Sequence, residues 1–241
     1  MRRDFFVRSI FGMMLYDSDR DSPRQAQSHA AMVLARLGGY SPALRPLPRR
    51  RMALSYNFNL EPSTMLLHAS DSTFLIVDMQ GRLMPVIHDN EAVLNSTHKL
   101  AQAARLLDVP VIATEHHSKM LGVTVDPLRD IVQSTFQKMH FSSAREPGFE
   151  AWLPAARKTI LVAGCEAHIC VLQTVIGLAD MGYKAVLVSD AAGSRKPADL
   201  HAALRRARAH GADIVTSEMA IFEWMETCEH PRFRDVLRLV K

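Results

Sequence analysis

Short apolar runs of strand length alternate with longer amphipathic stretches along the chain from Ser72 onward. Each run is continuous rather than alternating in polarity, which is typical of parallel strands that are buried on both faces. The runs lie at residues 74–77, 110–113, 138–141, 159–163, 185–188 and 213–215, and the helical stretches between them at 94–107, 151–157, 168–181 and 198–210. The sequence therefore predicts an α/β fold of three layers, in which helices cover both faces of a mostly parallel sheet of about six strands.

Polar side chains stand where these predicted strands end. The carboxyl ends of parallel strands meet at one edge of a sheet, next to helix N-termini, and functional groups gather there. Asp78 directly follows the first run, and Glu115, His116 and His117 follow the second. Lys138 opens the third run or lies just ahead of it, and Cys170 comes a few residues after the fourth. We therefore expect these side chains to lie close together.

The three cysteines, Cys165, Cys170 and Cys228, are too few and too uneven in number for a disulfide framework, and their spacing is not that of a zinc site. A thiol attacks a carbonyl as its thiolate, so a nucleophilic cysteine with an ordinary pKa of about 8.5 needs that pKa lowered. Cys170 is expected in the first turn of the helix over 168–181, where unpaired N–H groups favour a thiolate and can hold an oxyanion. Cys170 is therefore the candidate nucleophile; the alternative is a small core side chain.

Three stretches of the chain carry the residues that this chemistry would use. They are Ile76-Val77-Asp78-Met79-Gln80, Lys138 alone, and Gly164-Cys165-Glu166-Ala167-His168-Ile169-Cys170-Val171, followed by residues 190–195. Together they resemble the motifs of the isochorismatase-like cysteine hydrolases over residues 66–240, which implies the Rossmann-like fold of that superfamily. Residues 114–115, 121–124, 216–218 and 230–233 are similar, more narrowly, to the isochorismatase-domain-containing proteins of animals and bacteria, whose substrates are poorly assigned.

The resemblance implies a role for each residue. Asp78 would take the proton of the Cys170 thiol and later return it to the leaving group, while Lys138 would hold both by charge. The backbone N–H groups of Glu166 and Cys170 would form the oxyanion hole, with a cis peptide between Cys165 and Glu166. The expected reaction is hydrolysis of a small amide or ureido C–N bond through a thioester, without a cofactor. Isochorismate is disfavoured, since hydrolysis of its vinyl ether needs no thiol.

Each of these assignments has an alternative. Asp78 is otherwise a turn or cap residue at a strand end, and Lys138 a solvated lysine. The side chain of Glu166 either pairs with an arginine or a substrate amine or, as we favour, faces the strand end and uses only its backbone N–H. The alternative function is a catalytically silent oligomer that acts as a binding or regulatory module through the apolar residues 221–225.

Three histidines, His116, His117 and His140, invite a metal site, since imidazole is a frequent ligand. The metal-dependent nicotinamidases of the superfamily carry an Asp-x-His motif, which the segment after the second run lacks. Adjacent histidines also project in different directions from a loop. We therefore expect no metal and assign His116, His117 and Phe141 to the substrate pocket, with the alternative that only one of the two adjacent histidines lines it.

The N-terminal residues 1–51 differ from the rest of the chain in charge. They hold ten Arg and no Lys against four Asp, a net +6, so the remainder of the +4 chain carries −2. The segment is interrupted by prolines and free of Glu, and we expect it to lie outside the hydrolase domain of residues 52–241. It is a disordered arm, a non-native extension, or an organelle-targeting peptide, against which the acidic Asp17, Asp19 and Asp21 argue.

Composition also limits which binding partners and which cellular location we expect. No apolar run reaches the length of a membrane span, about 18 residues, and no secretory signal is recognised, so we expect a soluble cytoplasmic protein. The basicity is confined to residues 1–51, so we expect a small-molecule substrate and neither a nucleic-acid nor a membrane partner. By the resemblance, we expect a homo-oligomer, either a dimer or a tetramer.

Overall fold

The computed structural model describes residues 66–241, and our prediction for residues 1–51 lies outside them. Within the described part, six strands form one sheet in the order β3-β2-β1-β4-β5-β6, and every pairing is parallel. The strands are β1 (Ser72–Val77), β2 (Val111–His116), β3 (Ser134–Lys138), β4 (Thr159–Cys165), β5 (Lys184–Gly193) and β6 (Asp213–Val215). The predicted parallel sheet is therefore confirmed.

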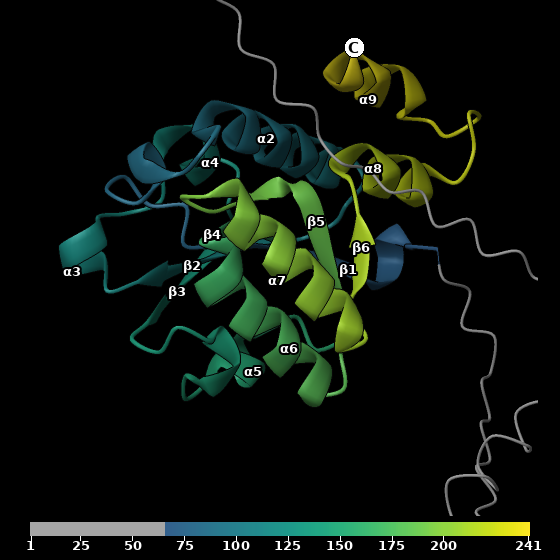
Figure 1. Ribbon diagram of the computed structural model, residues 1–241. Coiled ribbons are helices and arrows are strands. Elements are labelled where there is room, and N and C mark those ends of the chain that lie inside the picture. Colours follow the sequence, from purple (N-terminus) through teal and green to yellow (C-terminus); the bar gives the residue numbers. More distant parts are fainter. Residues whose placement is uncertain (1–65) are drawn as a thin grey trace, which may run out of the picture. The chain divides into compact units, whose positions relative to one another are not determined.

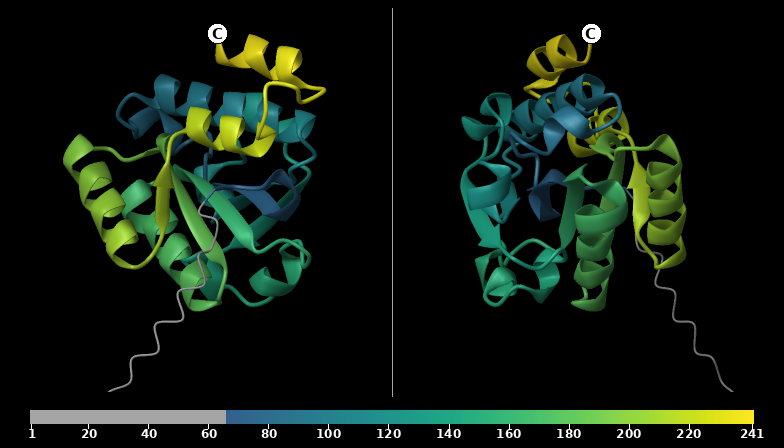
Figure 2. Two further views of the ribbon diagram at one scale, coloured as in Figure 1. Left: turned by 90° about the vertical axis from the view of Figure 1, so that its right-hand side faces the viewer. Right: turned by 60° about the vertical axis from the view of Figure 1, so that its left-hand side comes forward.

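Helices cover both faces of the sheet (Figure 1, Figure 2). One layer contains α2 (Asn90–Leu106), α8 (Ser217–Met225) and α9 (Phe233–Val240), and the other contains α5 (Phe149–Trp152), α6 (Leu172–Asp180) and α7 (Pro197–Ala209). The central strand β1 serves both layers, because Phe74 and Ile76 pack into the first core cluster while Leu75 and Val77 pack into the second. This alternation explains why a strand buried on both faces has a continuous apolar sequence.

Shorter elements connect the strands and helices. They are η1 (Ala69–Asp71), η2 (Met84–Val86), α3 (Ser118–Leu121), α4 (Asp126–Arg129), η3 (Ser143–Arg145) and η4 (Ala167–Val171). Most of them lie in loops, whereas η4 is a π-helical turn that leads directly into α6. Within residues 66–241 no helix has the length and apolar character needed to cross a membrane.

The third strand lies earlier in the sequence than predicted. We expected it at residues 138–141, but β3 spans Ser134–Lys138 and residues 139–141 form a loop. The reason is that β3 is the edge strand of the sheet, and most of its side chains are exposed and polar, so it contains no apolar run. As a consequence, Lys138 closes the strand and lies at its carboxyl end, as Asp78 does for β1.

Two of the predicted helices are shorter or less regular than expected. The helix expected over residues 151–157 is only one turn long and ends before Leu153, which is extended because Pro154 follows it. The helix expected over 168–181 begins with the π-helical turn η4 instead of a regular first turn. Turns of this kind occur frequently at functional sites.

The apolar residues 221–225 were our candidate interface for a binding module. In the structure they belong to α8, and Ile221, Trp224 and Met225 are buried in the core against α2. Of the residues in this segment, Phe222 is the apolar one that remains exposed. The segment is therefore part of the domain core, because a helix covering a sheet must bury one apolar face, and it offers little surface to a partner.

Candidate active site

The centre of the site is an ion pair between the residues that end β1 and β3. Lys138 Nζ lies 2.6 Å from Asp78 Oδ2, and both side chains are 0% exposed. Thr114 on β2 donates a hydrogen bond from Oγ1 to Asp78 Oδ1 at 2.8 Å. Asp78 has a φ of 54°, a left-handed conformation that Asp tolerates better than most residues. The sharp turn after β1 and the neighbouring strand β2 thus hold both carboxylate oxygens in place.

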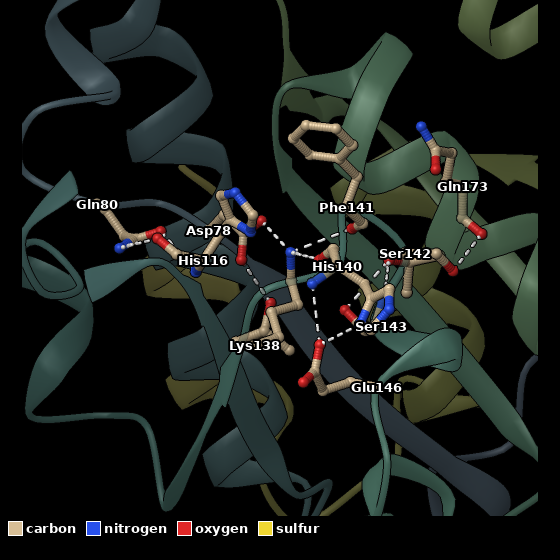
Figure 3. A network of polar contacts seen from close by, with 12 residues as sticks. Asp78, Gln80, His116, Lys138, His140, Phe141, Ser142, Ser143, Glu146 and Gln173 are labelled. Atoms are coloured by element: carbon tan, nitrogen blue, oxygen red, sulfur yellow. Dashed lines mark hydrogen bonds and ion pairs between the residues drawn. The ribbon is translucent and has the colours of Figure 1, made fainter. Parts of the chain in front are cut away.

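The ammonium group of Lys138 has two further acceptors. Nζ donates to the carbonyl oxygens of His140 at 3.2 Å and Phe141 at 3.1 Å, both in the loop after β3 (Figure 3). An ammonium group has three N–H donors, so with Asp78 it reaches its full complement. A buried charge is tolerated when it is paired and hydrogen-bonded, and Lys138 meets both conditions.

Cys170 lies in η4, directly after β4, and is 6% exposed. The Asp78 carboxylate is the charged group that acts most strongly on its thiol. Burial and then repulsion from Asp78 raise the pKa of Cys170 to about 12, although Lys138 acts in the opposite direction. Our expectation of a lowered pKa was therefore wrong, because desolvation and a carboxylate neighbour outweigh the nearby ammonium group. Cys170 is therefore a protonated thiol near a candidate base.

Glu166 caps the start of η4, four residues before Cys170. The peptide bond between Cys165 and Glu166 is cis, as expected from the resemblance. Its side chain accepts a hydrogen bond from Arg195 Nε at 2.7 Å. The interpretation that we favoured, in which only the backbone N–H of Glu166 is used, was therefore wrong, since the side chain pairs with an arginine that follows β5.

His116, at the end of β2, lies beside the ion pair and against an aromatic ring. Its ring centroid is 5.2 Å from that of Phe141 and 6.5 Å from that of His117. Its Nδ1 is buried and has no hydrogen-bond partner among the described residues. Burial, followed by the charge of Lys138, lowers the pKa of His116 below 6.5. Its imidazole is therefore neutral near pH 7.

The remaining predicted pocket residues lie on the loops after β2 and β3. Phe141 is 53% exposed, so its ring is partly open to solvent. His117 follows β2 and lines a cavity of about 470 Å³ at the sheet edge, together with Lys138 and Met139. The structure thus brings His116 and Phe141 together beside the ion pair, whereas His117 faces a neighbouring hollow.

A comparison with known protein families bears on this geometry. The sequence profile described as "Isochorismatase domain" matches residues 72–219, which include the ion pair and Cys170. The chain belongs to the isochorismatase family. The resemblance inferred from its motifs is therefore confirmed.

Relatives of this isochorismatase domain include proteins from an oomycete and from cattle. It is 34% identical over 178 residues to the "Secreted isochorismatase effector Isc1" of Phytophthora sojae (strain P6497), which covers 70% of this chain and 84% of that protein. It is 32% identical over 170 residues to "Isochorismatase domain-containing protein 2" of Bos taurus, which covers 70% of this chain and 83% of that protein.

Solved structures with this fold include "Structure of MAR1 Ribonuclease from Caenorhabditis elegans". It superposes with a TM-score of 0.69 and 31% sequence identity, over 73% of this chain and 92% of that one. YcaC from Pseudomonas aeruginosa has a TM-score of 0.68 at 22% identity, over 73% of this chain and 91% of that one, and supports the fold alone.

Sequence reasoning gave no role to three residues that organise the site of this isochorismatase domain. Thr114 holds Asp78, and its signal was a polar residue that directly follows the apolar run of residues 110–113. Glu115 is buried and accepts hydrogen bonds from Thr124 and from Gln137 of β3 at 2.7 Å, which ties down the loop after β2. Glu146 binds the loop after β3, and no pattern in the sequence marks it.

Gln80, the last residue of the first motif, also belongs to this framework. Its Oε1 accepts a hydrogen bond from the backbone N–H of His116 at 2.9 Å, and its Nε2 donates to the carbonyl of the same residue at 3.1 Å. Gln80 therefore fixes the backbone of His116 from both sides and supports local structure. No group of three or more His, Cys, Asp or Glu side chains suited to a metal ion occurs within residues 66–241 of this isochorismatase domain.

Proposed function

We propose that this chain is a cysteine hydrolase that cleaves an amide or ureido C–N bond of a small molecule through a thioester on Cys170. One observation carries the proposal: the buried Asp78 carboxylate, which Lys138 Nζ holds at 2.6 Å, is the charged group that acts most strongly on the Cys170 thiol. A nucleophile beside a base that a third group orients is the usual arrangement for covalent catalysis.

In the first half of the reaction, the thiol proton passes to Asp78 as the sulfur attacks the substrate carbonyl. The carbonyl oxygen becomes an oxyanion, which the backbone N–H groups of Glu166 and Cys170 are proposed to bind; such donors contribute roughly 3 kcal/mol each in other enzymes. The tetrahedral intermediate then collapses. The C–N bond breaks, Asp78 gives its proton to the leaving nitrogen, and an acyl thioester remains on Cys170.

In the second half, a water molecule attacks the thioester while Asp78 takes one of its protons. The new tetrahedral intermediate expels the sulfur, which regains the proton from Asp78, and the acid product leaves. Lys138 holds the carboxylate in place between the steps through their ion pair. The raised pKa of Cys170 fits this scheme, because a base beside the thiol removes the need for a free thiolate in the resting protein.

The burial of the reacting groups supports a small substrate. Cys170 is almost fully buried and the ion pair entirely so, so only a small group projecting into the site reaches the sulfur. The names of two relatives mention isochorismatase and ribonuclease, which would act on a vinyl ether and on a phosphodiester. Neither reaction requires the thiol of Cys170, so substituting Cys170 distinguishes both reactions from the proposed C–N hydrolysis.

The test is turnover by the full chain of a panel of small amides and ureides, with isochorismate and an RNA oligonucleotide alongside. We compare wild type with Cys170→Ala and with Cys228→Ala, a matched change at an exposed cysteine. We expect hydrolysis of at least one C–N substrate, lost in Cys170→Ala and kept in Cys228→Ala, with an acyl adduct on the Cys170 peptide by mass spectrometry. Turnover that survives in Cys170→Ala, on any substrate of the panel, would overturn the proposal.

We also propose that the chain assembles as a homo-oligomer. Met120, Val123, Met139 and Phe141 are exposed apolar side chains on the two loops that follow β2 and β3. Exposed apolar groups that lie together on a surface favour burial against a partner. Light scattering of the purified full chain tests this, and a monomer at micromolar concentration would contradict it.

A further inference from the structure

The loop after β3 points its backbone N–H groups at a single carboxylate oxygen. Glu146 Oε2 accepts hydrogen bonds from the N–H of Met139 at 2.9 Å and from the N–H of His140 at 2.9 Å. The Nδ1 of the His140 side chain lies 2.7 Å from the same oxygen. Figure 3 shows Glu146 below this loop, on the side away from Asp78. One carboxylate therefore fixes two successive peptide groups and a side chain.

Two carbonyl groups of the same loop bind a cation, the ammonium group of Lys138. The carbonyl oxygens of His140 and Phe141 accept hydrogen bonds from Lys138 Nζ at 3.2 and 3.1 Å. His140 takes part in both sets, since its N–H binds the carboxylate and its C=O binds the ammonium group. The N–H groups of Met139 and His140 belong to the two peptide groups before the Cα of His140, and the carbonyls of His140 and Phe141 belong to the two peptide groups after it. The two sets therefore meet at His140, and holding the first set limits how far the second set can turn.

We propose that Glu146 is a positioning residue for the reaction: it holds the loop of residues 139–141 so that the His140 and Phe141 carbonyls keep Lys138 Nζ against Asp78. This inference rests on the proposed function. Glu146 touches neither Asp78 nor Lys138 through its own side chain, and it acts on the ammonium group through the two carbonyl oxygens.

Glu146 makes stronger contacts with the loop than a surface ion pair alone would give. His140 is 54% exposed, and an ion pair between exposed groups contributes little by itself. The two backbone N–H bonds are different, because they order the main chain next to the site and Glu146 is only 17% exposed. These hydrogen bonds lower the pKa of Glu146 to about 2, so it remains ionised throughout the neutral range. A change in pH profile on its substitution therefore reports on the ion pair rather than on titration of Glu146.

The expected consequence of losing this carboxylate is a weaker hold on Lys138. If the loop relaxes, Nζ loses one or both carbonyl partners and moves from Asp78 and Cys170. The charge of Lys138 lowers the pKa of Cys170, so a more distant ammonium group leaves that pKa higher still. The reaction of Cys170 should slow, and the acidic limb of its pH profile should move upward.

The test measures alkylation of Cys170 by iodoacetamide across the pH range in the full chain, by peptide mass spectrometry. The variants are Glu146→Gln, Glu146→Asp and Glu150→Gln, the last a matched change at an exposed glutamate in α5. In Glu146→Gln we expect Cys170 to react about 10–100-fold more slowly, which is the usual effect of substituting a residue that orients a reacting group. The acidic limb of its pH profile should be shifted upward. Glu146→Asp should recover part of the rate, and Glu150→Gln should match wild type.

A second comparison separates positioning from general loosening of the structure. Residues that act through one group give non-additive effects, so Glu146→Gln should slow the reaction little further in a Lys138→Met background. Urea unfolding of each variant shows whether it is folded. If Glu146→Gln is not folded, Glu146→Asp is used in its place. Equal slowing in both backgrounds, or a wild-type rate and pH profile for the folded Glu146 variants, would overturn this inference alone. If variants of Asp78 and Lys138 alkylated Cys170 at the wild-type rate, the proposed function would be overturned together with this inference.

Discussion

Lys138 Nζ and Asp78 Oδ2 form a fully buried ion pair of 2.6 Å that joins the carboxyl ends of two strands that are not neighbours in the sheet. β2 lies between β1 and β3, and Thr114 of that strand completes the contact by donating to the other oxygen of Asp78. The three central polar groups of the site are therefore supplied by three adjacent parallel strands. The fold determines their distance, because Asp78 and Lys138 stand at strand ends and the parallel register pairs Thr114 with Val77, the residue before Asp78.

Breaking this pair should destabilise the domain strongly. Lys138→Met leaves the Asp78 carboxylate buried without its counter-charge, which costs roughly 3–5 kcal/mol in the free energy of unfolding. Replacing both partners, with Asp78→Asn in the same chain, should recover a large part of that loss, because no uncompensated charge remains. Urea unfolding of the two single variants and the double variant measures this. Additive losses would show that the two residues are not energetically coupled.

A second prediction concerns the contact between β1 and β4 beneath the site. Gly164 has a φ of 125°, and a Cβ at this position would lie 2.0 Å from the carbonyl oxygen of Val77, the residue before Asp78. Backbone atoms cannot move away as a flexible side chain can. Gly164→Ala should therefore cost more than about 3 kcal/mol in unfolding free energy, beyond the usual range for a point substitution.

Gly182→Ala is the matched control for this effect. Gly182 also has a positive φ, of 86°, but no atom lies within 4 Å of its Cβ position. The substitution should cost only the strain of a left-handed residue, about 1–2 kcal/mol. Similar losses for the two variants would show that the close approach of Val77 does not matter.

How much of this site was predictable from the sequence depends on the kind of contact. Asp78 and Cys170 follow apolar, fully buried strands, so the pattern of runs located them and the family motifs suggested their roles. β3 was misplaced because an edge strand with polar, exposed residues has no apolar signature. Lys138 was therefore identified by resemblance, and its place at a strand end became clear only from the structure.

Other features depend on the surroundings in three dimensions and could not be predicted. The raised pKa of Cys170 follows from burial and from the charge of Asp78, neither of which is encoded locally. The pairing of Glu166 with Arg195 joins the segments after β4 and β5, which the sheet order brings together. Glu146 acts on backbone groups, which every residue carries, so its sequence neighbourhood contains no signal.

His116 should make the stability of the domain depend on pH. Its pKa is lowered from 6.5 in the folded protein, chiefly by burial, so the folded state binds the proton less readily than the unfolded chain does. Stability is fully present above the unfolded pKa of 6.5 and is lost as the pH falls from there through the folded pKa. His116→Gln should therefore lose less stability than wild type between about pH 7.5 and about pH 5.

Two measurements check this prediction. Urea unfolding midpoints at the two pH values give the difference between wild type and His116→Gln, from which the contribution of the other histidines cancels. The ring proton resonances of His116 give its pKa directly by NMR titration. A midpoint pH at or above 6.5 for His116, or an unchanged pH dependence in the variant, would contradict the expectation.

The central claim is that Asp78 acts as the base for Cys170, and the pH profile of Cys170 alkylation by iodoacetamide tests it most directly. Peptide mass spectrometry follows Cys170 in wild type and in Asp78→Asn, with the exposed Cys228 of the same molecule as an internal reference for an accessible thiol. An unassisted thiol whose pKa is raised to about 12 would react through its thiolate alone, at a rate rising about tenfold per pH unit up to and beyond pH 9.

We predict that wild-type Cys170 reacts measurably near neutral pH at a rate that levels off below about pH 9, because Asp78 takes the proton during attack. The same thiol in folded Asp78→Asn should react at least about 100-fold more slowly at neutral pH and rise steadily with pH. A wild-type rate that climbs with pH as an unassisted thiol does, and equals that of Asp78→Asn throughout, would contradict the account.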